Sequence, residues 1–258
     1  MQHNSDLPAM SGLGSSSAFT VGFLNALYAL QGTPVTKMGL ALDALKVEQE
    51  IIKENVGSQD QVATAFGGFN KIEFPPASAK QNSGEKSGPE KVRVLPVAVP
   101  SATLRVLEDH LMLFFTGFSR NASEIAGEQI KNTSQKESEL RTMGAMVPEA
   151  INILNAGPAR LPEFGRLLNE SWKLKRGLSS KITNSHIDGM YDAARSAGAL
   201  GGKLLGAGGG GFMLVFAEPE KQQKIKEKLG EFLYVPFRFE QEGSQVIFKV
   251  DNEKTYVS

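Results

Sequence analysis

The stretch KLLGAGGGGFMLVF, residues 203–216, restricts the fold more than any other part of this sequence. Five glycines fill the six positions from Gly206 to Gly211, and both flanks are apolar and strand-like. Glycine permits positive φ and lets another backbone segment or a phosphate come close. The stretch therefore predicts two strands joined by a glycine loop, which is either a phosphate-binding loop or a crowded hairpin that needs no ligand.

A second glycine-rich turn lies near the start, where LPAMSGLGSSSA (residues 7–18) leads into apolar residues at helical spacing from Phe19 to Leu30. The first amides of a helix lack internal partners, and the helix dipole favours an anion there. GLGSSS is not a Walker loop, and Ser17 stands where the third glycine of the dinucleotide fingerprint would be. The turn is a candidate phosphate site, with a simple helix cap as the alternative.

Composition excludes several classes of protein. The 258 residues include no cysteine, which rules out disulfides, thiolate zinc sites and a cysteine nucleophile. Lys+Arg and Asp+Glu number 28 each, so we expect no nucleic-acid or membrane partner. No apolar run approaches the roughly 20 residues of a membrane span, and MQHNSD has no signal-peptide core. We therefore expect a cytoplasmic protein, and the three scattered histidines lack the spacing of metal ligands.

Helix and strand signals alternate along the chain, which predicts an α+β fold with a domain boundary near residue 100. The stretch PPASAKQNSGEKSGPEK has nothing to bury and is expected to be a mobile excursion between two strands. The expected strands are KIEF, VRVLPV, LMLFFTG, the two flanks of the glycine loop and two closing strands. Beyond the first helix, helices are expected over 36–54, 120–133, 137–155, 161–178, 187–198 and 219–230.

Residues 36–54 are predicted to form one helix with a broad apolar arc. At about 100° per residue, Glu48 projects near the middle of this arc, whereas Glu50 points to the polar side. A buried carboxylate needs a partner because an unpaired buried charge is costly. Mg²⁺ is one candidate, since it usually binds one or two carboxylates plus substrate phosphates. A buried salt bridge to Lys or Arg is the alternative.

The segment Ser58-Gln59-Asp60-Gln61 fits a capping box, with Ser58 as the N-cap and Gln61 at N3. This placement puts Asp60 in the first turn of a helix, where the dipole favours the carboxylate form. An ionised aspartate at a fixed turn suits a base that accepts a hydroxyl proton. The alternative is that Asp60 only stabilises the start of the helix.

Three motifs carry a family resemblance. PAMSGLGSSSA resembles the second motif of the GHMP kinases, KLLGAGGGGFMLVF resembles their third, and ENVGSQDQVATAFGGF resembles the segment with their catalytic aspartate. Together with DLPAMSGLGSSSAFTVGFLNALYAL and LFFTGFSRNASEI, they are most similar to the D-glycero-D-manno-heptose 7-phosphate kinases. These enzymes phosphorylate the anomeric hydroxyl of a sugar phosphate.

The resemblance implies a two-domain GHMP kinase fold. Residues 1–100 would form a partial N-terminal domain, ribosomal protein S5-like but without its first strands, and residues 101–258 a ferredoxin-like C-terminal domain. The chain starts just before the second motif, so an N-terminally truncated kinase is expected. We accordingly expect negligible turnover from this chain alone, self-association through its exposed apolar surface, and better folding of residues 101–258.

The resemblance also implies ATP and Mg²⁺ as cofactors. It assigns Asp60 as the catalytic base and Ser16 with Glu48 as metal ligands. Arg120 and Gly209 are the expected substrate-binding residues, with a solvated Arg120 as the alternative. The expected nucleotide-binding residues are Gly12, Leu13, Gly14, Ser15, Ser16, Ser17, Gly208, Gly209 and Gly210.

The implied function is ATP-dependent phosphorylation of heptose 7-phosphate, which serves the synthesis of nucleotide-activated heptose. A non-catalytic nucleotide-binding remnant is one alternative. A GHMP kinase for another small metabolite, such as fucose or galactose, is the other. The sequence leaves open whether the protein forms a homodimer.

Overall fold

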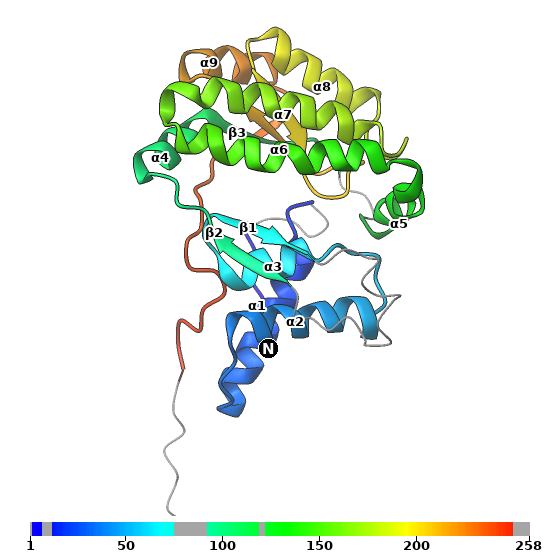
Figure 1. The fold of residues 1–258 in the computed structure, drawn as a ribbon, viewed down its shortest axis with the longest axis vertical. Coiled ribbons are helices and arrows are strands. Elements are labelled where there is room, and N and C mark those ends of the chain that lie inside the picture. Colours follow the sequence, from blue (N-terminus) through cyan, green and yellow to red (C-terminus); the bar gives the residue numbers. More distant parts are fainter. Residues whose placement is uncertain (1, 7–11, 75–91, 119–121, 250–258) are drawn as a thin grey trace, which may run out of the picture. The chain divides into compact units, whose positions relative to one another are not determined.

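The structure is a computed structural model that describes residues 2–6, 12–74, 92–118 and 122–249 (Figure 1). The chain forms two compact units, the first from residues 1–15 with 97–239, and the second from 16–96 with 240–258. The expected excursion at 75–91 lies outside the described residues. The domain boundary at residue 100 stays a prediction, because a compact unit need not coincide with a family domain.

The first unit combines helices with an antiparallel sheet whose order, within the described residues, is β4-β5-β3-β6. Its strands are β3 (Leu111–Phe115), β4 (Gly201–Leu204), β5 (Phe212–Phe216) and β6 (Leu233–Val235). Its α-helices are α4 (Ser101–His110), α5 (Ala122–Asn132), α6 (Glu137–Asn155), α7 (Leu161–Arg176), α8 (Ser185–Ser196) and α9 (Pro219–Lys228). All were expected, within a few residues, except α4.

Two adjacent glycines of β4 let the unit pack tightly. A Cβ on Gly201 would lie 2.0 Å from the carbonyl oxygen of Gly165 in α7. A Cβ on Gly202 would lie 2.6 Å from the carbonyl oxygen of Leu214 in β5, and the ring of Tyr191 in α8 would be at an ordinary contact distance of 3.4 Å. Figure 1 shows α6 and α7 side by side across this unit. The glycines thus bring two helices close to the strand that enters the glycine loop.

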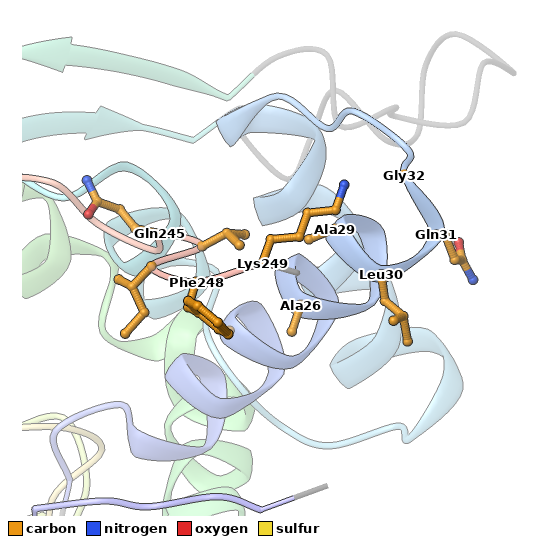
Figure 2. Close-up of a pocket in the computed structure, with 11 residues that line it drawn as sticks. Ala26, Ala29, Leu30, Gln31, Gly32, Gln245, Phe248 and Lys249 are labelled. Atoms are coloured by element: carbon orange, nitrogen blue, oxygen red, sulfur yellow. The ribbon is translucent and has the colours of Figure 1, made fainter. Parts of the chain in front are cut away.

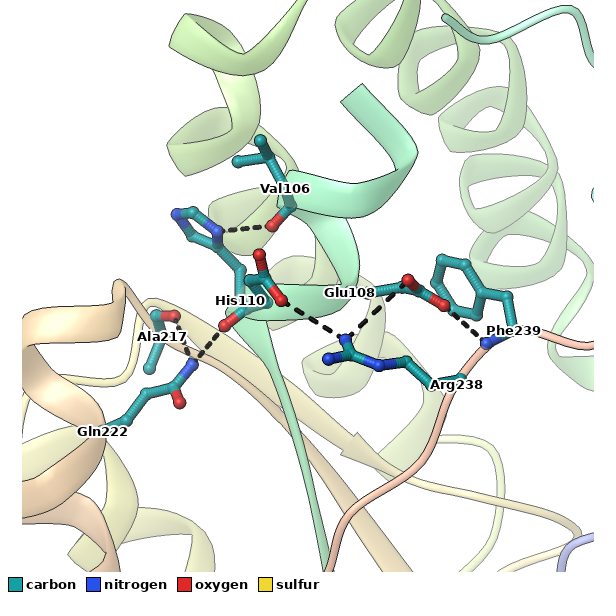
Figure 3. A network of polar contacts seen from close by, with 8 residues as sticks. Val106, Glu108, His110, Ala217, Gln222, Arg238 and Phe239 are labelled. Atoms are coloured by element: carbon teal, nitrogen blue, oxygen red, sulfur yellow. Dashed lines mark hydrogen bonds and ion pairs between the residues drawn. The ribbon is translucent and has the colours of Figure 1, made fainter. Parts of the chain in front are cut away.

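A polar network at the end of α4 fastens the chain after β6 (Figure 3). The Arg238 guanidinium lies 3.3 Å from an Asp109 carboxylate oxygen, and the amide of Phe239 donates to Glu108 at 2.6 Å. Gln222 of α9 donates to the Asp109 carbonyl at 2.5 Å. These contacts hold residues 236–239 to the first unit, just before the chain enters the second.

The second unit contains α1 (Ser15–Gln31), α2 (Lys37–Leu45), a π-helix (Lys46–Ile51), α3 (Gln59–Phe66), β1 (Asn70–Glu73) and β2 (Arg93–Pro96). The strands β1 and β2 pair antiparallel. Thr36 caps α2 through its side chain, which accepts from the Gly39 amide. The prediction of one regular helix over 36–54 is wrong, because the turn widens after Leu45.

The last described residues return to this unit. The amide of Gly68 donates to Glu240, and the amide of Ser244 donates to Thr64. A Cβ on Gly67 would lie 2.1 Å from the amide nitrogen of Gly243, so only glycine fits at this close crossing. The second expected closing strand does not form within residues 240–249. No helix in the described part of the chain is both long and apolar enough to cross a membrane.

Candidate functional site

A buried polar cluster joins three elements of the second unit. Glu48 of the π-helix is only 2% exposed, and its Oε2 accepts a hydrogen bond from Ser17 Oγ of α1 at 2.9 Å. Gln61 of α3 is fully buried and donates from Nε2 both to Glu48 Oε2 and, at 3.1 Å, to Ser17 Oγ. Sequence reasoning placed Glu48 in the interior but missed Gln61 as its partner.

Glu48 keeps an unused ligand atom. Its Oε1 is buried and has no hydrogen-bond partner among the described residues, and the same holds for Gln61 Oε1. No Lys or Arg in the described ranges pairs with Glu48, so the salt bridge considered from the sequence does not form there. A buried carboxylate with a free oxygen is the donor that a hard divalent cation binds. The residues present therefore fit Mg²⁺.

The serine that contacts Glu48 is Ser17, whereas Ser16 is exposed. Ser16 as a metal ligand stays a prediction. The described residues contain no cluster of three or more His, Cys, Asp or Glu side chains that could hold a metal. A Mg²⁺ ion completed by substrate phosphates and water does not need such a cluster.

Asp60 lies in the first turn of α3, as expected, but the capping box is wrong. Ser58 makes no side-chain cap, and its Oγ accepts from Gln49 at 3.2 Å. Gln61 turns inward to Glu48 rather than back to Ser58. The buried Glu48 carboxylate is a strong acceptor for the Gln61 amide group, and this hydrogen bond takes the place of the one that Gln61 Oε1 would accept from the Ser58 amide in a capping box.

The electrostatics of Asp60 link it to Glu48. The residue is exposed as a whole, yet its carboxyl group is crowded by protein atoms. This burial, and then the negative charge of Glu48, raise the pKa of Asp60 above that of an ordinary aspartate. The Glu48 and Asp60 carboxylates therefore repel each other, and a cation bound between them would relieve this repulsion.

The GLGSSS turn has the expected form. Gly12 and Gly14 have positive φ of +78° and +71°, and α1 begins at Ser15. The division between the two compact units falls inside this motif, after Ser15. Gly12 to Ser15 are half-buried, so their amides stand at the surface of a helix N-terminus.

The glycine loop joins β4 to β5 and contacts the GLGSSS turn within the first unit. Gly206 has φ +66°, and a Cβ there would lie 2.7 Å from the carbonyl oxygen of Gly12. The amide of Gly209 donates to the Ile182 carbonyl at 2.8 Å, and a Cβ on Gly210 would meet Phe118 at 2.9 Å. These close approaches support the crowded-hairpin interpretation for part of the loop, and they leave Gly209 without a free amide for a ligand.

Lys175 is a polar group at this loop that the sequence did not reveal. It lies in the last turn of α7 and donates to the carbonyl oxygens of Leu204 and Gly206. Lys173 and Arg176 beside it in the sequence gave no reason to single it out. Arg120, expected to bind substrate, lies outside the described residues.

The described residues also form a pocket of about 730 Å³ in the second unit, between α1 and the extended segment 245–249 (Figure 2). Ala26, Ala29 and Leu30 line it from the helix, and Phe248 with Lys249 line it from the segment. None of the candidate site residues lines this pocket. The candidate chemistry therefore lies elsewhere, at Glu48 and Asp60.

Protein-family models and known proteins were compared with this chain, and they agree on one family. The family model for the GHMP kinases N terminal domain matches residues 1–68, and the model for GHMP kinases C terminal matches residues 146–235. The D-glycero-alpha-D-manno-heptose 7-phosphate kinase of Campylobacter jejuni subsp. jejuni is 34% identical over 242 residues, which are 93% of this chain and 68% of that protein.

Two further relatives, one similar in sequence and one in structure, are also small-molecule kinases. The mevalonate kinase of Thermococcus onnurineus is 29% identical over 86% of this chain and 60% of its own length. The crystal structure of a D-glycero-D-manno-heptose 1-phosphate kinase from Bacteriodes thetaiotaomicron aligns with a TM-score of 0.67 at 26% identity, over 93% of this chain and 64% of that one. The chain thus spans about two thirds of the length of these relatives. By its two family matches, its sequence identity and its α+β architecture, the chain belongs to the GHMP kinase family of small-molecule kinases.

Proposed function

We propose that this chain carries the site of a Mg²⁺- and ATP-dependent sugar kinase that phosphorylates the anomeric hydroxyl of a sugar phosphate. The observation that carries the proposal is the buried Glu48 with its unpaired Oε1, whose charge acts on Asp60. D-glycero-D-manno-heptose 7-phosphate is the first candidate acceptor, supported by the 34% identity to the Campylobacter jejuni enzyme.

Asp60 acts as the base of the proposed reaction. As the acceptor oxygen attacks the γ-phosphorus in line, the bond to the ADP oxygen breaks and the hydroxyl proton passes to the Asp60 carboxylate. Burial raises the pKa of Asp60 and so makes it a stronger base than an ordinary aspartate, whereas Mg²⁺ bound at Glu48 would offset the contribution of the Glu48 charge. No covalent enzyme intermediate forms, so the rate depends on positioning and on neutralising phosphate charge.

The remaining residues hold the phosphates. Glu48 and a serine hydroxyl, Ser16 or Ser17, would hold Mg²⁺, which neutralises triphosphate charge when bound. The amides from Gly12 to Ser15 at the start of α1 would bind phosphate oxygens. Gly208 and Gly210 remain candidates on the glycine loop, whereas Gly209 would first have to release Ile182.

Calorimetry with a non-hydrolysable ATP analogue tests the nucleotide site. We expect binding in the range of about 1 μM to 1 mM that is typical of enzyme substrates, and stronger binding with Mg²⁺ than without it. Glu48→Gln should abolish the effect of Mg²⁺. Glu50→Gln is the matched control, because Glu50 is an exposed carboxylate two residues away. No heat with or without Mg²⁺ would contradict the proposal.

A coupled assay tests the acceptor. With an active, complete version of the kinase, we expect turnover with heptose 7-phosphate to exceed turnover with fucose, galactose or mevalonate at equal concentration. A preference for one of these would replace the proposed acceptor within the same family. Mg²⁺-dependent binding of the analogue without transfer to any acceptor would instead favour a non-catalytic nucleotide-binding module.

A further inference from the structure

Lys175 makes an unusual contact with the start of the glycine loop. Its Nζ donates to the carbonyl oxygen of Gly206 at 2.6 Å and to that of Leu204 at 3.2 Å. These two carbonyls flank Leu205, whose amide donates to Phe212 at 2.9 Å as the last hydrogen bond between the two arms of the hairpin. Lys175 therefore ties the end of α7 to the point where β4 turns into the loop.

Keeping Lys175 in this position costs desolvation free energy. Burial, and in second place the positive charge of Lys203, lower the pKa of Lys175 to about 7. No carboxylate of the described residues forms an ion pair with it, although nearby Lys173 pairs with Glu170 at 2.9 Å. An uncharged side chain at this position would avoid the cost of desolvation. The two hydrogen bonds from Nζ to backbone carbonyls are the stabilising interaction that Lys175 provides in return.

The loop needs such contacts because glycine restricts its own backbone so little. Other donors hold the later part: Gln129 Nε2 donates to the Ala207 carbonyl at 2.6 Å, and the Gly211 amide donates to Phe118 at 2.9 Å. Lys175 holds the first residue of the loop. Gly206 is also the residue whose backbone comes against Gly12 of the GLGSSS turn.

We propose that Lys175 is a positioning residue of the phosphate-binding loops: its amino group, held between the carbonyls of Leu204 and Gly206, fixes the glycine loop against the GLGSSS turn. The proposal rests on the proposed kinase function for its effect on nucleotide binding. Its effect on the loop itself does not depend on any ligand.

Three variants of the full chain test it. Lys175→Met removes the donors and keeps a long flexible side chain, whereas Lys175→Arg keeps donors at the same place. Lys173→Met is the matched control, because Lys173 lies on the same helix but is exposed and pairs with Glu170. If Lys175→Met does not fold, Lys175→Leu, which also lacks a hydrogen-bond donor, is measured in its place with the same expectation.

The first measurement is hydrogen exchange without ligand. In Lys175→Met we expect the amides of Leu205, Gly209 and Gly211 to exchange about tenfold faster, as expected for lost hydrogen bonds to a charged donor. The amides of α9, and all amides of Lys173→Met, should exchange as in the parent chain. Unchanged exchange at the three loop amides would overturn the proposal.

The second measurement is the Kd of the Mg²⁺–ATP analogue. Lys175→Met should bind about tenfold more weakly, while Lys175→Arg should stay within about threefold of the parent. A purely structural role would lower the melting temperature of Lys175→Met and leave its Kd unchanged, which would also overturn the proposal. If the parent chain binds no analogue, the proposed kinase function fails, and the exchange data still decide whether Lys175 holds the loop.

Discussion

Two carboxylates dominate the chemistry of this chain at the scale of single residues. Glu48 is buried with one oxygen committed to Ser17 and Gln61 and the other without a partner in the described residues. Its charge contributes to the raised pKa of Asp60. In the proposed site, Glu48 would bind Mg²⁺ beside Asp60 as the base, and the positive charge of the ion would stabilise the ionised form of Asp60.

Replacing Asp60 by Asn should separate turnover from binding. In an active, complete version of the kinase, the amide cannot accept the hydroxyl proton, so turnover should fall by about 10²–10⁴-fold in a coupled assay. The Kd of the ATP analogue should change little, because Asp60 acts on the acceptor. Asp192→Asn on the exposed side of α8 is the control and should leave turnover unchanged. Near-normal turnover of Asp60→Asn would return Asp60 to the role of stabilising the helix start.

The same variant makes a prediction about stability and pH. The folded chain holds the pKa of Asp60 above the 3.8 of an unperturbed aspartate, so the folded state binds more protons between these two pKa values. The free energy of unfolding therefore falls as pH rises through this window. Asp60→Asn should raise the melting temperature at neutral pH, and the gain should vanish below about pH 3.8, measured by thermal unfolding. A lower melting temperature at neutral pH would contradict the assigned cause.

At the scale of elements, Glu48 lies where the α-helix α2 changes into a π-helix. After α2 the backbone widens into a π-helix, in which the Ile52 amide donates to Val47, five residues back. The extra residue in this turn shifts the phase of all later side chains by about 100°. Ile51 and Ile52, which a regular helix over 36–54 would place on its apolar arc, are consequently 65% and 56% exposed. Glu48 still faces inward because it lies inside the widened turn.

The contact of α7 with β4 offers a prediction at this scale. Gly201→Ala would push a Cβ into the Gly165 carbonyl, so it should lower the free energy of unfolding by about 1–3 kcal/mol or more. Gly189→Ala in α8 is the matched control: a Cβ there meets nothing within 4 Å, and alanine should stabilise the helix by about 0.5–1 kcal/mol. Denaturant unfolding of both variants checks the opposite signs. Equal effects would show that backbone proximity is not what requires Gly201.

At the scale of the whole molecule, the chain forms two compact units and passes between them more than once. The second unit exposes apolar side chains at the pocket between α1 and residues 245–249, where Leu30 is 79%, Ile247 92% and Phe248 81% exposed. Neighbouring exposed apolar side chains of this size promote association. Self-association, expected from the sequence, thus has a specific candidate surface.

Light scattering tests that expectation. We expect the parent chain to form dimers or larger species at micromolar concentration through this surface. The double variant Ile247→Lys with Phe248→Lys should shift the population to monomer, because buried lysines at an interface would be unpaired. Leu233→Lys is the control, since Leu233 is 65% exposed on the other unit. A monomeric parent chain, or equal association of both variants, would show that the surface is not used.

Local sequence patterns determined many helices and strands of this protein and its family. The helix over residues 137–155, the strands β3 and β5 and the hairpin around the glycine loop follow from apolar periodicity and glycine clustering, which depend on neighbours in the chain. The same periodicity predicted that Glu48 faces inward, and Glu48 is buried, although it lies in a π-helix and not in the regular helix that was expected. The ordered motifs also indicated the GHMP kinase family, because they are contiguous and can be read without a structure.

Tertiary structure decided what depends on contacts between distant residues. The hydrogen bond from Gln61 to Glu48 replaced a local capping box, because the buried carboxylate is a strong acceptor that only the tertiary structure brings within reach of Gln61. The π-turn, which shifts the phase of the second helix, leaves no mark in the sequence periodicity. The contact of Lys175 with Gly206 joins residues 31 positions apart, and only the packing of α7 against β4 brings them together.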